Sequence, residues 1–251
     1  MFLKKVHIEF IAKNKDELEI LEKPYPSIQG TPSWFKDTPR YIHSHPDVDS
    51  YGDPNSTIKK CLPVVDILGA GYHIPLYSDV WVENAGELNL SFRWSIDSME
   101  VVTTQKPEQH KKYPVPPGYY DPVFKWINPW IVKTPPGWST LFLHPQHHED
   151  LPFKSLSAMV DTDKHPSPVN FPFFLRKGFD GLIPKGTPMI QVIPFKREKF
   201  KATYGYDKKN LLQKAWNKAH TVFFERYQKH FWSQKTYTIS EQKKSKCPMG
   251  F

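Results

Sequence analysis

The chain of 251 residues is long enough for one large domain and carries 34 Lys and Arg against 26 Asp and Glu, a net charge of +8. Its 17 Phe, 12 Tyr and 8 Trp supply more apolar surface than disordered chains contain, which excludes a fully disordered protein. The 25 prolines, about twice the usual share, interrupt helices along most of the length, so short strands and structured loops are favoured over a helical bundle.

The first 60 residues combine a short strand with a long polar segment. Residues 5–11 are expected to form the strand, and the charged side chains among the first ten residues lead us to expect no secretory leader. The five prolines between residues 24 and 46 favour extended backbone over helix. We therefore expect residues 1–60 to form an N-terminal strand and a proline-rich arm packed on the core.

Residues 61–200 carry the signals of a β core. Residues 88–96 alternate apolar and polar side chains, which is the period of a half-buried strand. The apolar run 62–68 belongs to the same region, and a Pro-Pro-Gly turn at 135–137 separates two apolar segments. Further strands are expected at 72–76, 79–83, 155–160, 171–176 and 189–195. The pattern predicts a mainly β fold of roughly eight to ten strands, a β-sandwich or jelly roll or a partly closed barrel.

After residue 200 the apolar period becomes helical. Large apolar side chains recur at three- and four-residue steps from Leu212 through Trp216 to Phe231, with lysines on the other side. This predicts one amphipathic helix from about Lys208 to about Gln234 whose aromatic stripe packs on the β core. The expected organisation is one domain in three parts: an arm (1–60), a β core (61–200), and a helix with a basic tail (201–251).

Positive charge is concentrated at the C-terminal end. Residues 196–251 contain 14 Lys or Arg and 4 Asp or Glu, a net charge of +10, whereas residues 1–195 carry a net charge of −2. Such asymmetry is typical of surfaces that meet nucleic acid or acidic partners. No known nucleic-acid motif accompanies it, so a solvated helix face with a lysine-rich tail is the simpler interpretation. No apolar segment is long enough to cross a bilayer, and we expect no membrane contact.

Histidines supply the first candidate site, a divalent metal centre holding Fe or Zn. His43 and His45 are two residues apart, and His144 follows an apolar segment. Imidazoles with a carboxylate are the ligand set of cupin-type metal enzymes, and His45 with Asp47 equally fits an Fe(II) and 2-oxoglutarate oxygenase. Against a metal site, His43 and His45 lie in a proline-rich segment, whereas metal ligands need a rigid element. Surface or turn histidines are the alternative.

Two further groups are candidate ligand-binding residues. Asp161 and Asp163 follow an expected strand, where two carboxylates can clamp a ligand or can accept backbone hydrogen bonds in a turn. Aromatic side chains between residues 119 and 138 can stack on a sugar or base, with core packing as the alternative. These aromatic candidates are Tyr119, Trp126, Trp130 and Trp138. Neither a GxSxG nucleophile turn nor a glycine-rich phosphate loop is present.

Six strings carry a resemblance to a known family: KPYPS, PSWFKDTP, IKKCLPVVDILGAGY, KWINPWIVKTPPGWSTLF, DLPFKSLSAMVDTD and VNFPFFLRKGFDGLIPKGTPMIQVIPFKRE. They resemble an uncharacterised family of T4-like tailed phages of marine bacteria, itself distantly similar to a bacterial domain of unknown function. The similarity covers about residues 18–200. It implies a phage-encoded protein in the cytoplasm of an infected cell or in the virion, and it transfers no catalytic residue.

The sequence as a whole favours an accessory protein that binds a small ligand or a phage or host protein through aromatic and histidine-bearing loops. Two alternatives remain open. One is a mononuclear metal enzyme, and the other is a virion structural component that forms homo-oligomers through its arms.

Overall fold

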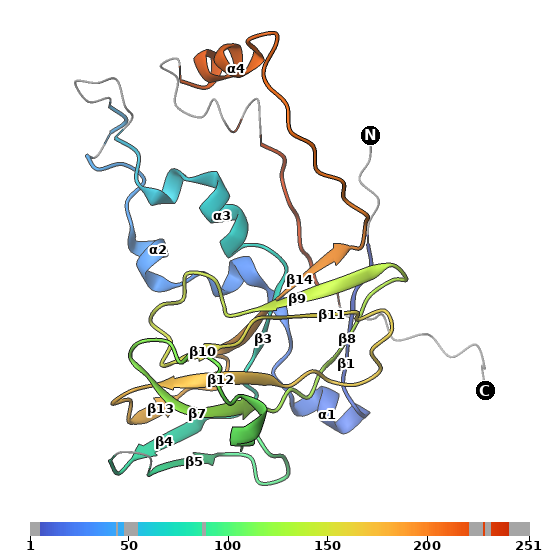
Figure 1. The fold of residues 1–251 in the computed structure, drawn as a ribbon. Coiled ribbons are helices and arrows are strands. Elements are labelled where there is room, and N and C mark those ends of the chain that lie inside the picture. The colour runs from blue at the N-terminus through green and yellow to red at the C-terminus, as the bar shows by residue number, and fades with distance from the viewer. Residues whose placement is uncertain are drawn as a thin grey trace, which may run out of the picture.

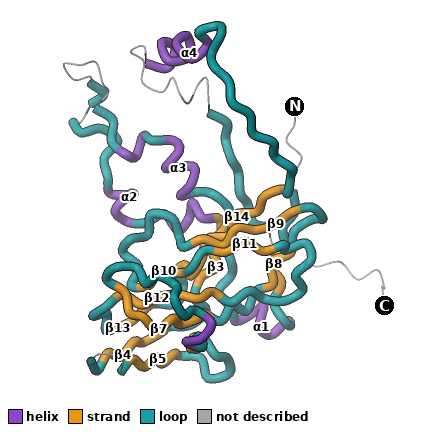
Figure 2. The backbone as a smooth tube through the Cα atoms, in the orientation of Figure 1, coloured by secondary structure: helices purple, strands orange, loops and turns teal. Residues whose placement is uncertain are grey.

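The computed structural model describes residues 6–43, 45–47, 55–86, 89–220, 228 and 232–240. Within these ranges the fold is mainly β, as the sequence predicts, with strands arranged in antiparallel sheets (Figures 1 and 2). The strands are β1 (Glu9–Ile11), β2 (Tyr25–Pro26), β3 (Tyr72–Pro75), β4 (Val80–Asn84), β5 (Leu90–Trp94), β6 (Val102–Thr104), β7 (Tyr119–Trp126), β8 (Ile131–Lys133), β9 (Trp138–Leu143), β10 (Phe153–Ser155), β11 (Ala158–Val160), β12 (Phe171–Arg176), β13 (Gly181–Ile183) and β14 (Pro188–Lys196). The helices are α1 (Lys15–Ile20), α2 (Ser33–Asp37), α3 (Leu62–Leu68) and α4 (Leu211–His220), with 3-10 helices η1 (Ser27–Gly30), η2 (Ile58–Lys60) and η3 (Pro107–Gln109).

The described strands form four sheets. The largest has the order β11-β9-β14-β3-β2, and a four-stranded sheet has the order β10-β12-β7-β6. Three strands pair as β13-β4-β5, and β1 pairs with β8. None of these sheets closes on itself, so the described part of the chain contains no closed barrel.

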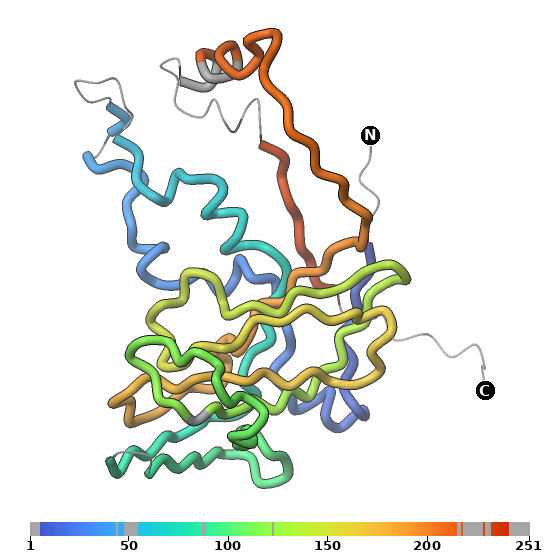
Figure 3. The backbone as a smooth tube through the Cα atoms, viewed as in Figure 1, coloured from blue at the N-terminus to red at the C-terminus, as the bar shows by residue number. Residues whose placement is uncertain are grey.

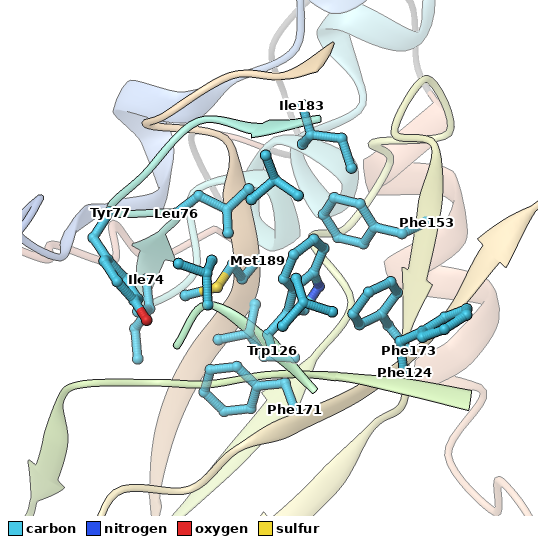
Figure 4. Packing of buried hydrophobic residues seen from close by; sticks show 14 of the residues in the cluster. Ile74, Leu76, Tyr77, Phe124, Trp126, Phe153, Phe171, Phe173, Ile183 and Met189 are labelled. Atoms are coloured by element: carbon cyan, nitrogen blue, oxygen red, sulfur yellow. The ribbon is translucent and has the colours of Figure 1, made fainter. Parts of the chain in front are cut away.

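Aromatic side chains fill the core between the five-stranded and four-stranded sheets. Phe142 of β9 meets Phe171 of β12 with ring centroids 5.5 Å apart, so the two sheets pack face to face. Trp126 of β7 is fully buried and stacks on Phe173 of β12 at 4.0 Å (Figure 4). Ser155 Oγ of β10 also donates a hydrogen bond across the core to a β14 carbonyl, at 2.7 Å. Burial of these large rings supplies the main stabilisation of the fold.

The expected strands are largely confirmed, and one apolar segment differs. Strand β12 has the predicted bounds, and β5 shows the predicted alternation of half-buried and exposed residues. The apolar run 62–68 forms helix α3 instead of part of the β core, and its Pro63 occupies the first turn, where no amide donor is needed. Gly71 then turns the chain into β3 with φ +70°, and a Cβ there would lie 1.9 Å from the carbonyl oxygen of Val192.

The predicted long C-terminal helix is not shown by the described residues, which contain the shorter helix α4 in this part of the chain. Helix α4 spans ten residues, and Trp232 to Gln234, expected at the helix end, are not helical. Leu211 and Leu212 are 59% and 73% exposed, and α4 stands away from the sheets (Figure 3). An amphipathic period specifies a helix, but docking also needs an uncovered apolar surface. Most of the predicted stripe beyond α4, including Phe223, Tyr227 and Phe231, lies outside the described residues.

A small lobe covers the outer face of the five-stranded sheet. It consists of residues 27–43 and 55–70, which include α2 and α3 (Figure 1). The lobe is fastened to β14 by the buried side chain of Gln191, whose Nε2 donates to the carbonyl oxygens of Ile67 at 2.8 Å and Ala70 at 2.7 Å. The indole of Trp34 on α2 donates to the carbonyl oxygen of His147 at 2.9 Å.

Candidate functional site

Two places in the structure concentrate functional chemistry: a buried histidine cluster and an exposed arm. The cluster results from the alternation of side chains between the two faces of β3. Tyr72 and Ile74 face the core, so the intervening His73 faces the lobe. The strand register places His73 beside Tyr25 on β2 and Gln191 on β14. A row of polar side chains therefore crosses the sheet beneath the lobe.

His148, in the loop after β9, completes the cluster. Its ring lies edge to face with that of His73, with centroids 5.5 Å apart. The two side chains are almost closed to solvent, with exposures of 1% for His73 and 6% for His148. Gly30 packs against the His73 ring, since a Cβ on it would be 2.6 Å from Nδ1 of His73. The fit requires glycine at this position.

Burial decides the protonation of these histidines. Desolvation, with a smaller contribution from His148, lowers the pKa of His73 to about 3. Desolvation also lowers the pKa of His148, and it lowers that of His144 to about 4. All three rings are therefore neutral near pH 7.

Several polar atoms of the cluster have no partner among the described residues. They are both ring nitrogens of His73, Nε2 of His148 and the hydroxyl of Ser27. Such buried groups are costly to desolvate. Because the cluster is closed to solvent, a substrate has no access to these imidazoles in this conformation, and their direct effect is on stability.

The three histidines proposed as metal ligands are not brought together. His43 and His45 are exposed in and beside the lobe, whereas His144 is half-buried and accepts a hydrogen bond from the backbone amide of Ser155 at 3.3 Å. Among the described residues, no group of three or more His, Cys, Asp or Glu side chains is placed to hold a metal ion. The described residues thus give no support to a metal centre at His43, His45 and His144, which stays a prediction from the sequence.

The aromatic candidates divide between core and edge positions. Trp126 is fully buried, and Trp130, 2% exposed, donates its indole hydrogen to the carbonyl oxygen of Glu22 at 3.2 Å. Trp138 and Tyr119 are half-buried at strand ends. Trp126 and Trp130 thus have the packing role that was the alternative to a ligand groove, because neither ring face is open to solvent.

Asp161 and Asp163 form a clamp with Arg197. Arg197 Nη1 lies 2.8 Å from Asp163 Oδ1 and 3.2 Å from Asp161 Oδ1. Asp163 also accepts the Gly137 amide at 2.8 Å, and Asp161 accepts the Ser139 hydroxyl at 2.6 Å. The hydrogen bond from Arg197 holds the pKa of Asp163 well below its usual range, and the hydrogen bond from Ser139 lowers that of Asp161. This arrangement fits the turn interpretation, because both carboxylates are engaged within the protein.

The clamp fixes the base of an exposed arm, which we define as residues 198–210. The chain leaves the sheet after Arg197 and runs without helix or strand up to α4 (Figure 2). The residues Phe200, Tyr204 and Tyr206 are 88%, 105% and 80% exposed. Four lysines on the arm are also exposed, namely Lys199, Lys201, Lys208 and Lys209. Asp207, the acidic side chain near its end, accepts the backbone amide of Leu212 at 2.7 Å and so caps α4.

The chain is fastened again where it returns to the body. The indole of Trp232 donates to the Asp66 carboxylate, 3.0 Å from each oxygen, and Lys235 forms an ion pair with the same carboxylate. The Tyr72 hydroxyl donates to the carbonyl oxygen of Thr238 at 3.1 Å. The excursion that carries the arm and α4 is thus anchored to the sheet at both ends.

Two depressions on the surface are too open to serve as an enclosed site. One depression of about 410 Å³ is lined by Lys111, Lys112 and Tyr113, and another of about 560 Å³ by Met159, Lys164 and His165. Both are open toward solvent. Small-molecule sites usually bury most of their ligand in a deeper cleft.

Sequence reasoning missed both the arm aromatics and the histidine pair. The signal for the arm is the interleaving of lysine and aromatic residues in KFKATYGYDKK, which shows neither a helical nor a strand period. The signal for His73 is its position between Tyr72 and Ile74 in a strand, which places its side chain on the opposite face of the sheet. The sequence does not show that the lobe buries this face.

Comparisons with known proteins supply no family for this chain. No protein-family model matches it, and no curated protein matches it. Within the described residues, no helix combines the length and the apolar character required to cross a membrane.

Proposed function

We propose that the protein is a binding protein that holds a polyanionic macromolecule on its arm. The observation that carries this proposal is the joint exposure of Phe200, Tyr204, Tyr206 and the arm lysines on a segment anchored at its base. Exposed aromatic rings are unfavourable in water, and concentrated positive charge attracts anions. A surface that combines the two therefore favours binding of an anionic partner.

The charges of the arm support a polyanion rather than a neutral partner. At the base, Arg197 is neutralised by the aspartate clamp, and Lys196 lies 3.0 Å from Glu198. In contrast, no ion pair involves the four arm lysines within the part of the chain that the structure describes. Lys214 on α4, which directly follows the arm, is also exposed and adds to the positive potential there.

The other candidate functions have less support. A metal enzyme needs a ligand set, and the described residues provide no group of three suitable side chains. A catalytic role for the buried histidine pair requires an opening, and His73 is 1% exposed. We propose to class the packed sheets as a β-sandwich scaffold that presents the arm.

Heparin chromatography of the full chain tests this proposal. We expect the wild-type protein to be retained and the double variant Lys199→Glu, Lys201→Glu to elute at clearly lower salt, because fewer counterions are released on binding. The matched control is Lys106→Glu, Lys177→Glu, which makes the same change in net charge at exposed positions away from the arm. Equal elution of the two double variants would contradict binding through the arm.

The similarity to the phage family leads us to propose in addition that the protein is phage-encoded and acts in the infected cell. Mass spectrometry of infected cells and of purified particles tests this. We expect the chain in the cell extract and not in the particle. Its recovery in particles would favour the virion structural role instead.

A further inference from the structure

We propose that the polyanion is a single-stranded nucleic acid whose bases stack on Phe200, Tyr204 and Tyr206. This inference rests on the proposed function and names the class of partner. Proteins that bind single strands without sequence preference combine a positively charged path for the backbone with aromatic side chains on which bases stack. The arm places both features on one short segment.

The aromatic rings fit stacking because their faces are open. Tyr204 is 105% exposed, Phe200 88% and Tyr206 80%, values that leave both faces of most rings available. Even a Cβ added at Gly205, between the two tyrosines, would meet nothing within 4 Å. Bases of every kind have a π face, so these rings give affinity without requiring a particular sequence.

Lysines lie beside two of the three rings along the arm. Lys199 and Lys201 lie on either side of Phe200, and Lys208 Nζ lies 5.2 Å from the centroid of the Tyr206 ring. Ammonium groups next to the stacking rings can contact the phosphates that follow each stacked base. Phosphate contacts and stacking are thereby offered at the same positions.

Duplex nucleic acid and a second copy of the chain fit less well. Reading a duplex groove usually takes a helix or a β ribbon, whereas residues 198–206 of the arm have neither. Pairing of two arms would bring like charges together, which disfavours a dimer through this surface. Bases in a duplex are also already stacked on each other, so the exposed rings would remain without partners.

The test is fluorescence anisotropy of labelled 20-residue oligothymidylate with the full chain, at about 50 mM salt. We expect the single strand to bind more tightly than a duplex of equal length. Each of the changes Phe200→Ala, Tyr204→Ala and Tyr206→Ala should lower affinity for the single strand at least about fivefold. Retention on heparin should be unchanged in these three variants. Because the rings are exposed, the variants should keep the folded circular dichroism spectrum of the wild type.

The control is Tyr113→Ala, since Tyr113 is 49% exposed and distant in the chain from the arm. This variant should bind the oligonucleotide like the wild type. The inference would be overturned if the three arm variants bound the single strand with wild-type affinity, or if single strand and duplex bound equally well. Retention on heparin through the arm lysines would in that case still support the proposed function. Loss of an oligomer in the arm variants, measured by light scattering, would identify a second copy as the occupant and also overturn it. If the double variant Lys199→Glu, Lys201→Glu changes neither oligonucleotide binding nor retention on heparin, the proposed function is overturned as well.

Discussion

The buried His73 makes the stability of the protein sensitive to mild acid. Its pKa is about 3 in the folded protein and about 6.5 when unfolded, so between these values the unfolded chain binds a proton that the folded chain does not. A group whose folded pKa is lowered in this way leaves stability intact above pH 6.5 and reduces it as the pH falls toward 3. Linkage gives a loss of about 2 kcal/mol between pH 7 and pH 5 from His73 alone.

The substitution His73→Phe isolates this contribution. Neither ring nitrogen of His73 has a hydrogen-bond partner among the described residues, so phenylalanine removes the titration without breaking a hydrogen bond. We expect the variant to be at least as stable as the wild type at pH 7 and to lose about 2 kcal/mol less than the wild type on acidification to pH 5. His148 stays in place and retains its own acid sensitivity.

Urea unfolding followed by tryptophan fluorescence at pH 7 and pH 5 measures the effect. The control is His165→Gln, which removes a histidine at an exposed position. Equal losses of stability in the wild type and His73→Phe would refute the reasoning, since His73 would then carry the same proton in the folded and unfolded chains.

Three further predictions concern the scaffold. Gly71→Ala should reduce the free energy of unfolding by more than about 2 kcal/mol, because its Cβ would meet the Val192 carbonyl at a φ of +70°, whereas Gly205→Ala should be neutral; urea unfolding compares them. Trp126→Ala should cost about 3–5 kcal/mol in the same assay, and Trp81→Ala, at a position 38% exposed, should cost less. Asp163→Ala should speed hydrogen exchange of the Gly137 amide, which donates to that carboxylate, and unchanged protection would contradict the clamp.

Strands with one clear face were predictable from local pattern. The alternation in residues 88–96 corresponds to β5, and the apolar segment 171–176 is β12 with the same bounds. The structure of residues 62–68 was not predictable in this way, because a short apolar run fits a buried strand and a buried helix equally well. The proline at position 63 and the glycines at 69 and 71 are compatible with the start and end of a helix. The close fit of Gly71 against β14, which favours the helix over a strand, is a tertiary contact and is not visible in the local sequence.

The site was less predictable because exposure and convergence depend on the whole fold. A tryptophan such as Trp126 has the same sequence signal whether it lines a groove or fills the core. Asp161 and Asp163 were recognisable as a pair, but Arg197, their partner, lies more than 30 residues later in the chain. The helical period beginning near Leu212 was real, yet it carries no information about whether the helix finds a surface to dock on.

Limited trypsin digestion of the full chain, with and without a single-stranded oligonucleotide, tests the binding role of the arm most directly. An exposed arm without regular structure predicts first cuts after Lys199, Lys201, Lys208 or Lys209, and these cuts should slow when the oligonucleotide is added. First cuts confined to other segments would contradict the exposure of the arm. Unchanged cutting of the arm in saturating oligonucleotide would contradict its role in binding.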